Sequence, residues 1–159
     1  MRELIDDEGG VGVIELALIV PLLILLTVGV LDVARAMNAA VVLESASQDA
    51  VHAAVLDPSA TIPPGQAVPP PIASAARGRV APLDGSSITV TVQYYDSASG
   101  TFRPWPTAGI PTSSPNPVGV MVRVNVSYPW TAVSALAAGF LSPAGPRTLT
   151  STSIMETRR

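Results

Sequence analysis

The chain has 159 residues and is 48% hydrophobic, yet only 13% of it is charged and 4% aromatic, with a formal net charge of −3. The absence of cysteine excludes disulfides, a thiolate nucleophile and cysteine-based metal sites, and the nine basic residues form no patch that would recommend a nucleic-acid partner. Because the apolar residues gather near the N-terminus, only about 100 residues remain after Leu56, enough for one small domain.

Residues 1–10 form a short acidic leader that ends in two glycines and is too short to fold alone. Residues 11–33 are predicted to be a transmembrane helix, because they would form a helix about 34 Å long against a hydrocarbon core of about 30 Å. Glu15 and Asp32 are the only ionisable residues of this segment. Glu15 is either an interfacial acid favoured by the helix dipole or a paired, functional carboxylate.

Residues 34–56 are predicted to continue the same helix, because they contain no Gly or Pro and are rich in Ala, Leu, Glu and Gln. Small apolar side chains recur at three-to-four spacing: Ala36, Ala39, Ala40, Leu43, Ala46, Ala50, Ala53 and Ala54. This stripe is expected to pack on the chain's own sheet, on other copies of the helix, or on both in succession. His52 falls on the polar face near Asp49, where a surface contact is expected.

Residues 57–86 are predicted to be a Pro-rich linker with a short helix near residues 72–80. Residues 87–159 are predicted to form a small antiparallel β domain. Alternating apolar and polar residues indicate strands at 88–95 and 118–128, a last strand is expected at 147–156, and residues 96–117 are expected to be a long loop. These elements predict an α+β fold in which the long helix packs on a sheet of about three strands.

The sequence shows no constellation of catalytic chemistry. It has a single histidine, no phosphate-binding loop that follows a strand, and no metal-ligand spacing. We therefore expect a protein that is not an enzyme and that uses no cofactor or metal.

The N-terminal half has a characteristic order of residues: Gly10, then Glu15 with the apolar run Leu16 to Leu23 after it, then Gly29, Asp32 and Ala34-Arg35-Ala36. In this order it resembles the TadE-like family of pseudopilins, which are minor components of tight-adherence pilus systems. The Ala-rich residues up to 56 and the Val-rich strand ending Ser127-Tyr128-Pro129-Trp130 are also similar to that family.

The resemblance implies a membrane-anchored pilus assembly protein processed by a prepilin peptidase. Cleavage after Gly10 would make Val11 the first residue and Glu15 the fifth of the mature chain. An acid at that position is expected to pair with the free amine of a neighbouring subunit, since an unpaired charge in an apolar assembly is costly. The expected partners are the bilayer, the peptidase and other pilin or pseudopilin subunits. The expected topology is single-pass, with a cytoplasmic N-terminus and an extracytoplasmic C-terminal domain.

Two alternatives remain at this stage. One is a secreted or membrane-tethered envelope binding domain with a signal peptide or signal anchor at residues 1–36, because Ala34-Arg35-Ala36 fits a small-x-small cleavage pattern. The acidic leader and the uninterrupted helical propensity across residues 34–36 argue against that cleavage. The other is a single-span anchor for an envelope domain unrelated to pili, which shares all the physics of the pseudopilin.

Overall fold

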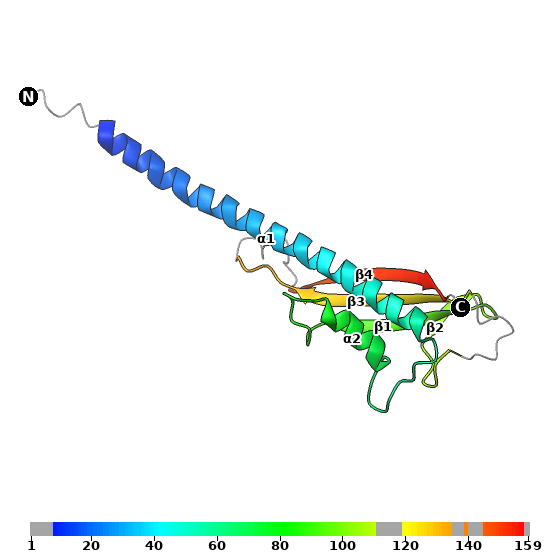
Figure 1. Ribbon diagram of the computed structural model, residues 1–159. Helices are drawn as coiled ribbons and strands as arrows, with labels where there is room; N and C mark the ends of the chain where they lie inside the picture. Colours follow the sequence, from blue (N-terminus) through cyan, green and yellow to red (C-terminus); the bar gives the residue numbers. More distant parts are fainter. Residues whose placement is uncertain (1–7, 111–118, 135–138, 140–144, 158–159) are drawn as a thin grey trace, which may run out of the picture. The chain divides into compact units, whose positions relative to one another are not determined.

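The computed structural model describes residues 8–110, 119–134, 139 and 145–157. Its helices and strands are, in order, α1 (Glu8–Leu56), α2 (Pro70–Gly78), β1 (Thr89–Asp96), β2 (Thr101–Pro104), β3 (Met121–Trp130) and β4 (Arg147–Glu156) (Figure 1). The predicted α+β class is confirmed: one long apolar N-terminal helix accompanies a small antiparallel sheet. The sheet has four strands instead of about three.

The chain divides into two compact units, and α1 contributes to both. The first comprises residues 1–36 and 131–146, and the second comprises residues 37–130 and 147–159. Helix α1 begins at Glu8 and continues through Pro21 without interruption to Leu56. Residues 1–7 of the expected leader lie outside the described part of the chain, as does Val118, with which we expected the second strand to begin.

The sheet belongs to the second unit and has the strand order β2-β1-β3-β4, with every neighbouring pair antiparallel. The register places Val92 of β1 opposite Val124 of β3, and Val124 opposite Ser153 of β4. Because side chains alternate along a strand, the valines of β1 and β3 share one face. On this face Val122, Val124 and Val126 are completely buried, so the predicted valine row forms the centre of the core.

Strand β2 is the strand that the sequence did not predict, and it lies within the segment 96–117 expected to be a loop. It has only four residues and ends in Pro104, which is too short for an alternating pattern to be recognised. The preceding turn makes the pairing with β1 feasible, because the Gly100 N–H donates to the Asp96 carbonyl at 2.8 Å and Gly100 has a φ of +66°. The Asp96 carboxylate also accepts the Ala98 N–H at 3.1 Å.

The second half of α1 and helix α2 cover the valine face together. Five members of the predicted stripe are buried: Ala39, Leu43, Ala46, Ala50 and Ala54. Ala40, however, is exposed, so this member of the stripe is not part of the core of the chain. The buried positions follow a spacing of three to four residues that also includes Ser47 and Val51. Ala40 lies on the same side of the helix, seven residues before Ser47, so helical periodicity does not explain its exposure. Ile72 and Ala76 of α2 complete this core without any exposure.

The linker after α1 is fixed to the segment after β2. The Ile110 N–H donates to the Pro58 carbonyl at 2.8 Å, and the indole N–H of Trp105 donates to the Ala60 carbonyl at 2.9 Å. Gly109 allows this close approach: its φ is +83°, and a Cβ there would lie 2.5 Å from the Ser59 carbonyl oxygen. Hydrogen bonds to its backbone carbonyls therefore order a Pro-rich segment that has no regular structure of its own.

Candidate functional site

The N-terminal half of α1 is a long apolar surface. The helix is long and apolar enough to cross a membrane: the segment Gly12–Leu56 contains a window with a mean hydropathy of 2.7, and no part of that window is buried. Large aliphatic side chains from Val13 to Val33 are exposed, and most of them keep half or more of their surface accessible. In a soluble protein, apolar patches of this extent mark a surface that contacts other proteins or lipid.

The residues singled out for processing and assembly lie at the beginning of this surface. Gly10 and Val11 fall in the first turn of α1, which starts at Glu8. Glu15 lies just over one turn further and is exposed. The structure places all three on one continuous helical segment, and among the described residues the Glu15 carboxylate has no hydrogen bond or ion pair.

Apart from its two acids, this apolar segment contains one polar side chain, Thr27. Its hydroxyl donates to the Leu23 carbonyl at 2.8 Å, one turn back along the helix. Such a bond satisfies the hydroxyl without any partner from another chain. Gly12 and Gly29 leave open space, because a Cβ at either position would meet no atom within 4 Å. The Thr27 hydroxyl therefore has its hydrogen bond within the helix, and Gly12 and Gly29 are two positions where a neighbouring chain can approach closely.

Asp32 marks the end of the apolar segment, and its exposed fraction is only 3%. Its carboxylate accepts the Val133 N–H at 3.2 Å, the Ser134 N–H at 3.0 Å and the Ser134 hydroxyl at 2.6 Å. The Arg35 guanidinium lies 4.0 Å away, one turn later on the helix. A carboxylate with this many donors can stay charged while it is buried.

The sequence analysis noted Asp32 only as an ionisable residue and as part of the family resemblance. Its role in holding Val133 and Ser134 against α1 was missed, because a contact between residues about 100 positions apart leaves no local periodicity. The signal available was weak: a lone acid at the end of an apolar run, followed by an arginine three residues later.

The polar face of the second half of α1 carries a structural ion pair. Asp49, which the sequence placed near His52, instead pairs with Arg79, which follows α2. His52 is exposed on the helix surface. Within the ranges that the structure describes, no group of three or more His, Cys, Asp or Glu side chains is arranged to hold a metal ion.

A comparison with known protein families gives a match that covers the candidate site. Residues 10–52 match the model of a family described as TadE-like protein. This confirms the resemblance expected from the sequence over α1, including Gly10, Glu15 and Asp32. The strand ending at Trp130, which we also expected to be similar, lies outside the match. No curated protein and no solved structure matched the chain.

Proposed function

We propose that this chain, TadE-like through residues 10–52, is a membrane-anchored, non-enzymatic pseudopilin or minor pilin that takes part in assembling a tight-adherence type pilus. The observation that carries the proposal is the coincidence of the family match with the exposed apolar half of α1. In this proposal the apolar segment inserts in the bilayer and contacts the same segment of other subunits, while the sheet domain lies on the extracytoplasmic side.

In this proposal a prepilin peptidase cuts after Gly10, so that Val11 carries the new amine and Glu15 is the fifth residue. A free ammonium and a carboxylate in an apolar assembly each need a partner of opposite charge. The Glu15 carboxylate supplies one partner, and the amine of a neighbouring subunit supplies the other. Exposure of Glu15 on the helix supports this role, because the carboxylate is accessible to another chain.

N-terminal sequencing of the protein recovered from membranes tests the processing step. The proposal expects Val11 as the first residue, and Gly10→Leu is expected to leave the leader attached. An intact Met1 would instead support an uncleaved anchor. A start at Met37 in the medium would support the secreted binding domain and would overturn the membrane-anchored function.

Substitution of Glu15 tests the assembly step. Glu15→Gln keeps the size of the side chain and removes its charge, so the protein should fold and enter the membrane but form few pili. Glu44→Gln is the matched control, because Glu44 is exposed on the same helix outside the apolar segment. Pili are counted by electron microscopy in cells that lack the native gene. Normal pilus numbers with Glu15→Gln would contradict the pairing role.

The topology has a direct chemical test, because the chain has no cysteine. Thr148→Cys places a single thiol on the exposed start of β4. A maleimide that does not cross membranes should label this thiol on cells whose outer envelope has been permeabilised while the inner membrane stays intact. Labelling only after the inner membrane is lysed would reverse the proposed orientation.

A further inference from the structure

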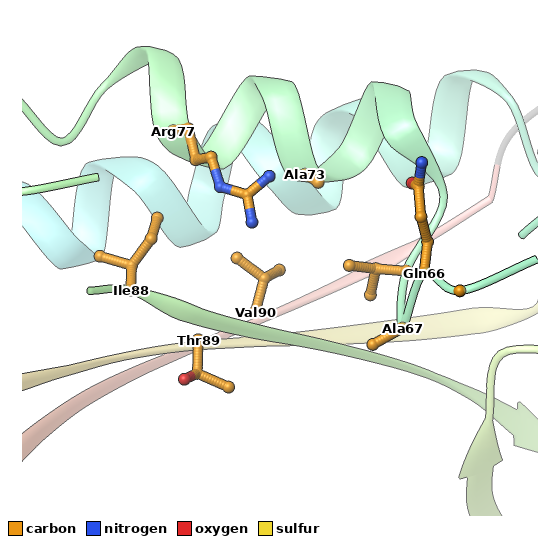
Figure 2. A pocket seen from close by; sticks show the side chains of 9 residues that line it. Gln66, Ala67, Ala73, Arg77, Ile88, Thr89 and Val90 are labelled. Atoms are coloured by element: carbon orange, nitrogen blue, oxygen red, sulfur yellow. The ribbon is translucent and has the colours of Figure 1, made fainter. Parts of the chain in front are cut away.

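A groove lies between α2 and the beginning of β1, within the second unit. Its volume is about 390 Å³, and it is open to solvent. The floor is apolar and nearly buried, with Val68, Ala73, Ile88 and Val90 exposed by 7% or less. Figure 2 shows Val90 of β1 and Ile88, the residue before β1, pointing toward α2, with Gln66 at one end. The floor accommodates one or two aliphatic side chains.

Arg77 supplies an unneutralised positive charge at this groove. Figure 2 shows its guanidinium projecting from α2 over Ile88 and Val90. Among the described residues, Arg77 makes no side-chain hydrogen bond and no ion pair. Arg79, two positions later, is instead neutralised by Asp49. The groove therefore has an electrostatic preference for an anionic group that no residue in the described part of the chain satisfies.

The edge of β1 beside the groove has backbone groups that form no hydrogen bond with any described segment. The Val92 carbonyl accepts the Trp105 N–H at 3.2 Å, so the backbone polar groups of Val92 face the β2 side of β1. Backbone groups of alternate residues point to the same side of a strand, which places the N–H and carbonyl of Val90 on that side as well. β2 pairs only with residues 93–96 of β1, and no other described segment bonds to Val90 on this side.

We propose that this groove binds an extended, acidic segment of another polypeptide. The segment adds a strand to β1 through the N–H and carbonyl of Val90, buries an aliphatic side chain against Ala73 and Ile88, and presents an Asp or Glu side chain to Arg77. Unpaired strand edges are templates for added strands, and pockets beside the edge select the side chains. Arg77 is the one charged side chain among the described residues that line the groove, and a single guanidinium at an open rim suits one side-chain carboxylate.

The test uses the full chain in detergent micelles, labelled with ¹⁵N. The probe is a peptide of about eight residues with blocked ends, alternating Thr and Val and carrying one central Glu. The expected result is a shift of the Ile88 and Val90 amide signals and slower hydrogen exchange at the Val90 amide. The Gln version of the peptide should bind about tenfold more weakly, because the hydrogen bonds of a carboxylate to a guanidinium are charge-assisted.

Matched variants distinguish binding at the groove from non-specific attraction of the peptide to positive charge. Arg77→Gln should remove the preference for Glu over Gln, while Arg147→Gln, which removes an exposed arginine from β4, should preserve it. Ala73→Leu fills the floor and should weaken both peptides, and the unchanged signals of Val122 and Val124 would show that it folds. The proposal is overturned by unshifted Val90 signals, by equal binding of the two peptides, or by a stronger response to an unblocked C-terminus. These outcomes do not depend on pilus assembly.

Discussion

Ser47 is the clearest place to test how α1 is attached to the sheet. It is completely buried, and its hydroxyl donates to the Glu44 carbonyl at 2.9 Å. Because that proton is used within the helix, the hydroxyls of Ser151 and Ser153 on β4 donate to the Ser47 oxygen, at 3.1 and 2.7 Å. The one proton and the two lone pairs of the buried Ser47 hydroxyl are thus all used in hydrogen bonds.

Ser47→Ala removes the acceptor for both β4 hydroxyls. At about 1 kcal/mol for each hydrogen bond, the free energy of unfolding should fall by about 1 to 2 kcal/mol. The lower end of this range is expected if water replaces Ser47, since Ser151 and Ser153 are half-buried. Ser45→Ala is the control: its hydroxyl bonds only to the Val41 carbonyl on the exposed face, and its effect should stay below about 0.5 kcal/mol.

The measurement is urea unfolding of the full chain in detergent, followed by the fluorescence of the two tryptophans. Both are in the second unit and are exposed by 7% or less. The decisive variant is the triple change Ser47→Ala, Ser151→Ala and Ser153→Ala, which removes all three hydroxyls. Replacing all partners of a hydrogen-bonded set is often nearly neutral, so the triple variant should recover most of the lost stability. A loss of unfolding free energy in the triple variant that equals the sum of the losses in the three single variants would refute this account of the contact.

Three further changes probe other contacts. Asp32→Asn should raise hydrogen exchange at the Ser134 amide about tenfold or more, because a neutral amide cannot accept all three bonds, and unchanged exchange would contradict the anchoring role. Gly109→Ala should lower the free energy of unfolding by about 2 kcal/mol or more, since a positive φ and the Ser59 carbonyl both oppose a Cβ, and an unshifted urea midpoint would argue against this strain. Hydrogen bonds from Ser99 and the Ala98 N–H, with the charge of Arg103, lower the pKa of Asp96. Because the folded pKa lies below the unfolded one, this contribution is present at neutral pH and is lost as the pH falls below 3.8 toward the folded pKa. Asp96→Asn should therefore reduce the decline of melting temperature over that range, and identical pH profiles would contradict the assignment.

The sequence predicted those parts of the fold that depend on local periodicity. The bounds of β4 agree with the predicted strand at 147–156, and the valines of β3 and most of the alanine stripe are buried as expected. Strand β2 escaped prediction because its pairing depends on the turn at Gly100 and on the edge of β1, not on a pattern of its own. Pairing across a tight turn is a property of two segments together.

The residues of the candidate site also differ in whether the pattern of a single helix or strand could indicate them. Gly10 and Glu15 were singled out through the family resemblance, and their roles stay a prediction; the structure places both on one continuous helix. The role of Asp32 required the chain to return about 100 residues later, and the role of Arg77 required β1 to lie beside α2. Neither arrangement follows from helical or strand periodicity, which describes only one element at a time.

The internal hydrogen bond of Thr27 has a consequence for how neighbouring helices align. Between Glu15 and Asp32 this hydroxyl is the only polar side-chain group, and it is already bonded to Leu23. Aliphatic contacts alone discriminate poorly between two helices shifted lengthwise by a turn. The carboxylates of Glu15 and Asp32, about 26 Å apart along the axis, are the two charged groups of this segment that can set the register between chains in the proposed assembly. Asp32 is already bonded to Ser134 within its own chain. If the chains associate as we propose, Glu15 is therefore the carboxylate expected to fix their alignment.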